Sequence, residues 1–248
     1  MSNTHNRRLL RLSGADASDF LQGLITNDIQ KVNQGLVYAA ILSPQGKYLA
    51  DFFVFKEGAD LILDTHEDQT DMLAKHLTMY KLRADVVIEN DARTVSRGLG
   101  TPDDGAFIDP RCDAVGWRAY DGRTDDDTVD WAALNIEHLI PQAGIELSGD
   151  SYILEMGFER LNGVDFKKGC YVGQEVTARM KHKTEFKKGL ARVQIEGSAP
   201  IGTDITTADG KTAGTLFSQS ATQALAYLRF DRATGPLNAK DAQITYAP

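Results

Sequence analysis

The pattern of apolar and polar positions along the first ninety residues predicts a mixed α+β unit. Two segments, 16–30 and 68–80, place apolar residues every three to four positions, as one face of a helix does. Extended runs are expected around these segments at 9–12, 35–42, 47–55, 61–63 and 84–88. The turn at 43–46 joins two of the runs as a hairpin. With the two helices these runs give the order β-α-β-β-β-α-β, which contains the β-α-β-β-α-β elements typical of a ferredoxin-like unit.

The composition and spacing of residues change twice in the rest of the chain. Residues 91–150 are rich in Asp, Gly and turn dipeptides, with one helix expected at 130–140 before Pro141. A further helix is expected at 175–183. From about Gly189, short alternating runs separated by Gly, Pro and Asp-Gly turns predict a small antiparallel β-barrel or sandwich. The sequence thus predicts an N-terminal α+β lobe at 1–90, a second lobe at 91–188 and a C-terminal β domain at 189–248.

Composition narrows the class of protein. The 248 residues are 42% apolar and 25% charged, which is typical of a globular chain and excludes a disordered one. The longest apolar runs, such as 37–42, fall far short of the roughly 18 residues that cross a bilayer, so no membrane partner is expected. Two cysteines, Cys112 and Cys170, give no disulfide framework and suit a reducing compartment. We therefore expect a cytoplasmic protein, or one of the mitochondrial matrix if its source is eukaryotic.

Charge is distributed unevenly along the chain. The net charge of −8 disfavours nucleic acid as a partner, since phosphate binding depends on clustered Lys and Arg. Much of the acidity lies at 103–130, where nine Asp face three Arg. At 167–192 the balance reverses, with eight Lys or Arg against two Glu. Either segment could be a solvated surface, but the basic one also contains the most distinctive string of the sequence.

Several common motifs are missing from the sequence. No P-loop, dinucleotide fingerprint or Gly-x-Ser-x-Gly elbow is present. The five histidines show neither the i, i+4 pairing nor the nearby cysteines that a zinc site needs, so no metal site is predicted. Serine hydrolysis and metal-dependent hydrolysis are therefore excluded as interpretations.

The distinctive string is Lys-Gly-Cys-Tyr-Val-Gly-Gln-Glu at 168–175. A cysteine reacts as its thiolate, which neighbouring cations and a helix N-terminus favour. Lys167 and Lys168 precede Cys170, and a helix is expected shortly after it, so an accessible, activated thiol is one interpretation. The other is a small buried residue in a glycine-rich turn. Cys112 lies among aspartates that oppose thiolate formation, and we interpret it as structural.

The octet resembles the signature of the YgfZ-type folate-binding proteins, relatives of the glycine cleavage system T-protein, an aminomethyltransferase. Four further segments look like that family in its order: 20–28, 44–53, 79–83 and 161–164. The resemblance implies a T-protein-like α+β fold, with two ferredoxin-like α+β lobes that bind folate and a small antiparallel β-barrel at the C-terminus.

The resemblance also implies a function. It points to a factor that binds tetrahydrofolate, or a derivative, and supports assembly or repair of iron–sulfur clusters in client enzymes, rather than to a conventional enzyme. Cys170 would be the functional thiol, with Lys168 beside it. Asp51 matches one member of the T-protein's aspartate pair, while Ala50 replaces the other. Glu155 would accept two hydrogen bonds from a pterin. The remaining predicted folate contacts are Gly169, Tyr171, Gly173, Gln174, Glu175 and Arg179.

Two other functions stay open at this point. One is a folate-dependent aminomethyl or one-carbon transferase that uses Asp51. The other is a folate-independent thiol redox or adaptor protein. For a folate ligand, the basic segment offers candidates that would attract the glutamate tail: Lys181, Lys183, Lys187 and Lys188. Expected protein partners are iron–sulfur clients or assembly proteins.

Overall fold

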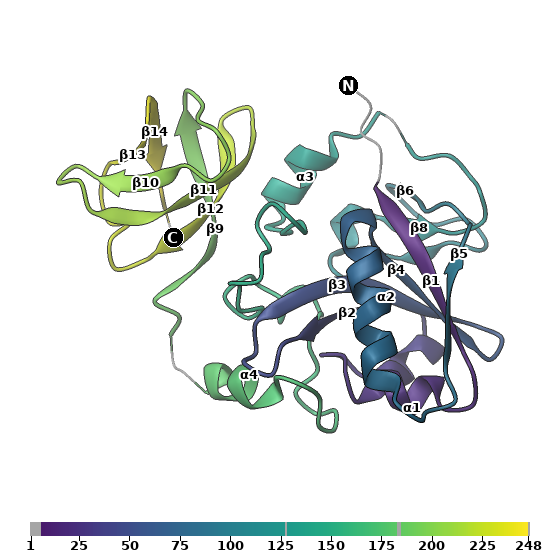
Figure 1. Cartoon of the computed structure of the whole chain (residues 1–248). Helices are drawn as coiled ribbons and strands as arrows, with labels where there is room; N and C mark the ends of the chain where they lie inside the picture. The colour runs from purple at the N-terminus through teal and green to yellow at the C-terminus, as the bar shows by residue number, and fades with distance from the viewer. Residues whose placement is uncertain (1–5, 127, 183–184, 248) are drawn as a thin grey trace. The chain divides into compact units, whose positions relative to one another are not determined.

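The computed structural model describes residues 6–126, 128–182 and 185–247 (Figure 1). The chain divides into two compact units. The first comprises Met1–Val129 and Glu159–Ala178, and we call it the N-terminal unit. The second, the barrel unit, comprises Asp130–Phe158 and Arg179–Pro248. The predicted middle part, 91–188, therefore contributes to both units, because its segments pack with different neighbours.

A five-stranded antiparallel sheet organises the N-terminal unit, with strand order β2-β3-β4-β1-β5. Its strands are β1 (Arg7–Ser13), β2 (Val37–Leu42), β3 (Tyr48–Glu57), β4 (Asp60–His66) and β5 (Val87–Asp91). The first four correspond to runs expected from the sequence, whereas β5 begins three residues later than the expected run 84–88 and overlaps it only at 87–88. The predicted helix at 68–80 is α2 (Glu67–Lys81). The helix expected at 16–30 is instead α1 (Ala17–Gln22) and the 3-10 helix η1 (Ile29–Asn33). It is interrupted because the Thr26 N–H donates to the Ala40 carbonyl of β2.

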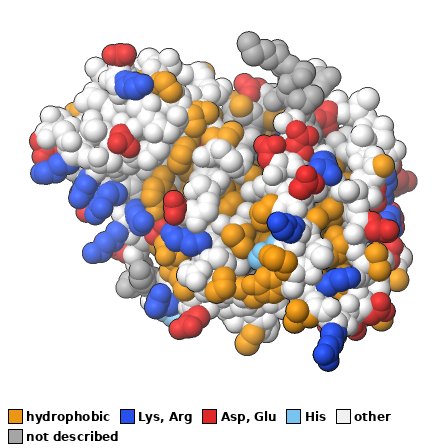
Figure 2. Space-filling model, in the orientation of Figure 1, with side chains coloured by type: hydrophobic (Ala, Val, Ile, Leu, Met, Phe, Trp, Pro, Cys, Tyr) orange, Lys and Arg blue, Asp and Glu red, His pale blue; other side chains and the backbone are white. Residues whose placement is uncertain are grey.

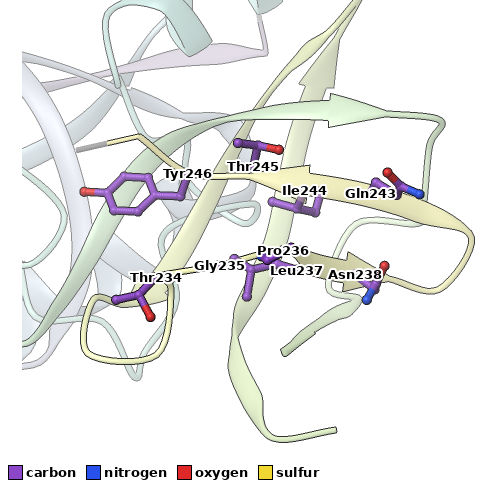
Figure 3. A pocket seen from close by; sticks show the side chains of 9 residues that line it. All are labelled: Thr234, Gly235, Pro236, Leu237, Asn238, Gln243, Ile244, Thr245 and Tyr246. Carbon is purple, nitrogen blue, oxygen red and sulfur yellow. The ribbon is translucent and has the colours of Figure 1, made fainter. Parts of the chain in front are cut away.

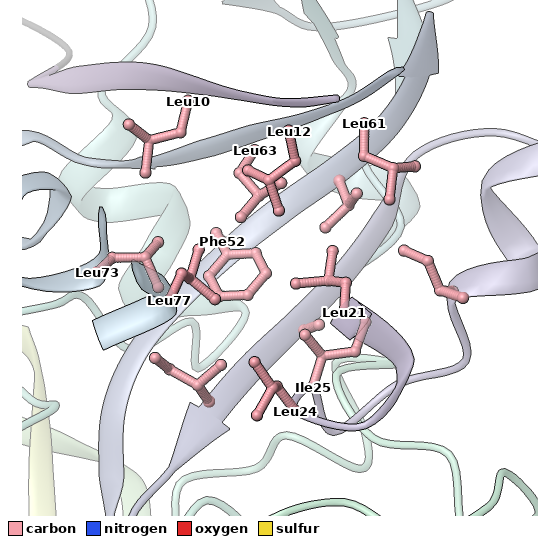
Figure 4. Close-up of a cluster of buried hydrophobic side chains, with 14 of the residues drawn as sticks. Leu10, Leu12, Leu21, Leu24, Ile25, Phe52, Leu61, Leu63, Leu73 and Leu77 are labelled. Carbon is pink, nitrogen blue, oxygen red and sulfur yellow. The ribbon is translucent and has the colours of Figure 1, made fainter. Parts of the chain in front are cut away.

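The main core of this unit lies between the sheet and its helices (Figure 4). Leu10 and Leu12 point to the same face of β1 because strand side chains alternate. Leu73 and Leu77 meet them from α2, four residues apart on one helical face. All four side chains are at most 1% exposed, so the alternation read from the sequence marks the core.

A second, smaller sheet follows in the same unit. It has the order β6-β8-β7, with β6 (Ser96–Gly98), β7 (Phe107–Ile108) and β8 (Trp117–Ala119). The short 3-10 helix η2 (Asp113–Val115) precedes β8. Buried charges tie this sheet to the larger one: Arg118 of β8 donates to Asp64 of β4 at 3.0 Å and to Asp109 at 3.1 Å. Part of the acidic segment is therefore internal.

The barrel unit contains a closed six-stranded barrel, which confirms the barrel expected from the family resemblance. Around it run β10 (Asp204–Thr207), β11 (Thr212–Ser220), β12 (Gln223–Arg229), β9 (Lys188–Glu196), β14 (Ala242–Thr245) and β13 (Leu237–Ala239). The alternating runs expected from the sequence correspond to β9, β11, β12 and β14, and no run was expected at β10 or β13. The helix α3 (Trp131–Glu137), capped by Asp130, contacts β11 and β12.

The helix α4 (Gln174–Lys181) follows the cysteine-containing string, and its residues up to Ala178 belong to the N-terminal unit. Among the described residues, no helix has the length and apolar character needed to cross a membrane.

Candidate functional site

The loop that carries Cys170 is bound to the segment after α1. The Thr26 hydroxyl donates to the Gly163 carbonyl at 2.6 Å, and the Asp165 N–H donates to the Thr26 carbonyl at 3.0 Å. An ion pair of 2.7 Å joins Lys31 to Asp165. Two of the segments that carry the family resemblance, 20–28 and 161–164, therefore lie against each other and support the cysteine loop.

Lys168 is the last anchor before the cysteine. Its ammonium donates to the Gln22 carbonyl at 2.6 Å and to the Ile25 carbonyl at 2.5 Å. Carbonyls at the end of a helix carry partial negative charge and favour a cation. Burial lowers the pKa of Lys168 to about 8, although Asp28 and Asp165 oppose the shift. Lys168 thus holds the loop in place, and its predicted part in the chemistry of the thiol has no support from its contacts.

The other flank of the loop packs against the β2–β3 hairpin turn. Tyr171 is buried, and Gly173 has a φ of +84°. A Cβ at Gly173 would lie 2.7 Å from the Ser43 carbonyl oxygen. At Gly46 in the turn, a Cβ would lie 2.7 Å from the Cβ of Val176 in α4. Gly173 therefore allows the cysteine loop to approach the backbone of the turn, and Gly46 allows the turn to approach the Val176 side chain.

Gly173→Ala is expected to destabilise the N-terminal unit by about 2–3 kcal/mol, because it combines a strained φ with a clash against backbone. The matched control is Gly58→Ala in the β3–β4 turn, where φ is +61° and no atom lies within 4 Å of the added Cβ. That control should cost about 1 kcal/mol. Urea unfolding measures both, and equal losses would contradict the close-packing role of Gly173.

Cys170 itself lies on the surface between these two anchors. Gly169 and Cys170 are exposed, whereas Lys168 and Tyr171 on either side are buried. The thiol is free. The expected helix begins only at Gln174, four residues later, so Cys170 does not immediately precede the helix N-terminus as predicted. The structure therefore shows an accessible thiol in a fixed position. Cys112 is also free but half-buried.

The next residues of the motif lie at the start of α4. Gln174 donates from its side chain to the Gly169 carbonyl at 3.3 Å, bridging the exposed tip of the loop. Glu175 is exposed in the first turn of the helix. The contacts of these two residues with folate remain predictions. The Gln174 hydrogen bond helps to hold the tip of the loop in place.

Asp51 occupies a buried polar cluster on β3. Its carboxylate accepts from the Tyr48 hydroxyl at 2.5 Å and from the Tyr38 hydroxyl at 3.0 Å. Burial, together with the charge of Asp51, raises the pKa of both tyrosines, which keeps them protonated as donors. Both oxygens of Asp51 are therefore occupied. Sequence reasoning missed the tyrosines; the hairpin register, which pairs Ala40 with Asp51, would have placed Tyr38 diagonally beside it.

Glu155 belongs to the barrel unit. One of its oxygens, Oε2, accepts a hydrogen bond from the Tyr227 hydroxyl and lies 3.8 Å from the Lys188 ammonium. Burial raises the pKa of Tyr227, and Glu155 raises it further. Among the described residues, Oε1 has no hydrogen-bond donor. Tyr227 was not predicted, although its position between the buried Ala226 and Leu228 on β12 marks it as pointing outward from the barrel.

The predicted site residues are therefore divided between the two units. Asp51 and the motif residues 168–175 lie in the N-terminal unit, while Glu155 and the exposed Arg179 lie in the barrel unit. Of the basic candidates, Lys183 lies outside the described residues.

A pocket of about 520 Å³ is also present on the barrel (Figure 3). It is lined by uncharged residues of 234–238 and 243–246, and none of the predicted site residues is among them.

Comparison with known proteins shows several similarities. Residues 187–248 match the family model of the CAF17 C-terminal β-barrel domain. The mitochondrial iron–sulfur cluster assembly factor IBA57 of Mus musculus is 31% identical over 288 residues, covering 96% of this chain and 79% of that protein. The Homo sapiens protein of the same name is 28% identical with the same coverage.

A solved structure is also similar, that of the glycine cleavage system aminomethyltransferase T from Bartonella henselae. Its TM-score is 0.72 at 13% sequence identity, with 98% of this chain and 83% of that chain covered. At this identity the likeness shows the fold alone, and it confirms the T-protein-like arrangement expected from the sequence.

Proposed function

Since the chain belongs to the family of the iron–sulfur cluster assembly factor IBA57, we propose that it serves iron–sulfur cluster assembly through an exposed cysteine and a bound folate. The single observation that carries the proposal is the position of Cys170. Two buried anchors, Lys168 and Tyr171, hold an exposed two-residue tip that presents the thiol to a partner. A fixed, accessible thiol of this kind can react with a group carried by another protein, or bind a metal that the other protein carries.

The chemistry of clusters indicates what that partner supplies. Iron–sulfur clusters are held mainly by cysteine thiolates, usually four of them. The motif loop offers one thiol, so a cluster that contacts Cys170 would take its remaining ligands from an assembly or client protein. The proposed partner is therefore an iron–sulfur protein rather than a small molecule alone.

Folate binding is the second part of the proposal, and Glu155 supports it. Tyr227 holds Oε2 of this carboxylate in place, while Oε1 lacks a donor among the described residues. A fixed carboxylate can accept N–H groups from a pterin ring and its amino group. The residue lies where the family resemblance expects a pterin contact.

Titration with tetrahydrofolate tests this part. We expect saturable binding by calorimetry, weakened roughly 10- to 100-fold in Glu155→Gln, because a hydrogen bond to a charged group contributes about 1.5–3 kcal/mol. The control is Glu196→Gln, an exposed glutamate at the end of β9. If the unsubstituted protein shows no saturable binding at millimolar ligand, folate is excluded as the ligand. The folate-independent thiol adaptor would then be the remaining interpretation.

The transferase alternative has less support. It needs Asp51 to take part in the reaction, yet both oxygens of this buried carboxylate accept hydrogen bonds from tyrosines. Turnover of an aminomethyl donor with tetrahydrofolate that is lost in Asp51→Asn would restore this alternative.

The names of the relatives bear on location. The IBA57 proteins of Mus musculus and Homo sapiens are described as mitochondrial. For a eukaryotic source this favours the matrix, and the cytoplasmic address expected from the sequence has no support from these relatives.

A further inference from the structure

Two methionines and a histidine share one open face of α2. Met72, His76 and Met79 follow the spacing i, i+4, i+7, which places them in one line along a helix. Leu73 and Leu77 turn to the sheet and are buried. Met72 and Met79 are instead 39% and 60% exposed, and His76 is half-buried. Figure 2 shows hydrophobic side chains next to a histidine over the part of the N-terminal unit where Figure 1 draws α2. We call Met72, His76 and Met79 the methionine–histidine triplet.

The ring of His76 is held in place without a hydrogen bond. It stacks on the Tyr80 ring one turn further along the helix, and the two ring centroids are 4.6 Å apart. Within the described part of the chain, neither ring nitrogen of His76 has a hydrogen-bond or ion-pair partner. Burial lowers the pKa of His76, so the imidazole is neutral near pH 7 and one nitrogen keeps an available lone pair. A neutral imidazole is the form of histidine that binds metals.

The donor atoms of the triplet select the kind of metal. Thioether sulfur is a soft, uncharged ligand that favours Cu(I), and imidazole also suits copper. Zn²⁺ prefers thiolates, imidazoles and carboxylates, and Ca²⁺ and Mg²⁺ prefer oxygen ligands. Asp71 precedes the triplet, but its carboxylate pairs with Arg8 at 3.0 Å. Three neutral donors provide no negative charge to balance a divalent ion, so the triplet favours a soft monovalent cation.

The side chains of the triplet are long enough for their donor atoms to converge. Residues three and four apart on a helix have Cβ atoms about 5–6 Å apart. Methionine rotates about three side-chain bonds and adapts its shape to its surroundings. Because Met72 and Met79 are exposed, their thioethers can turn toward the imidazole of His76 with little loss of packing.

We propose that the methionine–histidine triplet is a surface site for Cu(I), with two thioether sulfurs and one imidazole nitrogen as its ligands. The site lies on a helix that carries none of the residues assigned to the thiol or to folate. It is therefore independent of the proposed function, and either proposal can fail without the other.

The test is anaerobic titration of the full chain with Cu(I), in competition with the coloured Cu(I) chelator bicinchoninate. Cys112→Ser and Cys170→Ser are introduced together beforehand, because thiolates also bind soft cations. We expect the chain to bind a single Cu(I). Its affinity should fall by about tenfold or more in Met79→Leu and in His76→Gln, since loss of groups that only orient metal ligands already lowers affinity about 10- to 100-fold.

Two features of the variants separate ligation from packing. Met79→Leu keeps the volume and apolar character of the side chain, so lost binding with an unchanged unfolding transition identifies the sulfur as the ligand. The matched control is His138→Gln, which removes a half-buried histidine of the barrel unit and should keep the affinity for Cu(I).

The methionine methyl groups provide a direct readout by NMR. The probe is Ag(I), which has the same closed d shell as Cu(I) and keeps its oxidation state. We expect the methyl signals of Met72 and Met79 to shift together on addition of Ag(I), while those of the buried Met156 and Met180 stay in place.

Three results would overturn the inference. One is the absence of Cu(I) binding by the chain that lacks both thiols. Another is unchanged affinity when Met72 and Met79 are both replaced by leucine. The third is equal affinity for Zn²⁺ and Cu(I), because a site of two thioethers and one imidazole must prefer the softer ion.

Discussion

Replacing Cys170 with serine in the native host is expected to lower the activity of iron–sulfur enzymes to that of cells lacking the protein. The difference should be largest under oxidative stress, when clusters are damaged most. A serine hydroxyl does not ionise near neutral pH and cannot act as a thiolate toward iron or a persulfide. Because Cys170 is exposed, the substitution should change the stability of the fold by less than about 0.5 kcal/mol. Assays of iron–sulfur enzymes in cell extracts give the readout.

The matched control is Cys112→Ser, which removes the other free thiol of the chain. It is half-buried, so its stability must be checked, but the enzyme activities should stay near normal. Alkylation of the purified protein should modify Cys170 before Cys112. Unchanged enzyme activities in Cys170→Ser, with the variant present at normal levels, would show that the thiol is dispensable and would overturn the proposed function.

Arg118→Met is expected to produce the largest loss of stability, about 3 kcal/mol, because it removes the buried cation shared by Asp64 and Asp109 and leaves each carboxylate with one arginine, Arg7 or Arg111. The Arg118 side chain is 4% exposed and pairs with Asp64 and Asp109, which are 0% and 3% exposed. Its guanidinium also lies 3.9 Å from the centre of the Phe53 ring. The measurement is urea unfolding of the full chain, followed by a probe specific to the N-terminal unit because two units need not unfold together.

The pH dependence distinguishes this mechanism from simple loss of packing. Burial opposes ionisation of Asp109, but Arg111 and Arg118 lower its pKa to about 2. Its contribution to stability is therefore present above about pH 4, the ordinary pKa of Asp, and lost as the pH falls toward 2. The gap between the native protein and Arg118→Met should narrow over this range.

A surface pair provides the control for Arg118→Met. Arg123→Met breaks a 2.5 Å pair with Asp121 at the surface, which should cost far less stability than Arg118→Met because solvent screens an exposed ion pair. Similar losses in Arg118→Met and Arg123→Met, or a gap independent of pH, would contradict the importance of the buried network.

The strands β1 to β4 could be predicted because their apolar residues alternate or form continuous runs, whereas β5 has no such pattern and was expected three residues too early. β1 and β3 alternate or carry continuous apolar runs, and α2 repeats every three to four residues. The segment 16–30 shows the limit of this reasoning. Its apolar spacing suits a helix, but two hydrogen bonds end the helix early: the Thr26 N–H donates to the Ala40 carbonyl of β2, and the Ala40 N–H donates to the Thr26 hydroxyl.

Among the candidate site residues, the sequence by itself singled out the thiol. Cys170 stands in a motif specific enough to be recognised, and its glycines and flanking residues mark a tight turn. Tertiary structure alone decided the roles of its neighbours. Lys168 binds the carbonyls of Gln22, at the end of α1, and of Ile25 beyond it, and Asp51 accepts hydrogen bonds from two tyrosines. Such contacts join residues far apart in the chain, so the local sequence pattern cannot predict them. What a charged side chain does depends on which distant atoms the fold brings within hydrogen-bond distance of it.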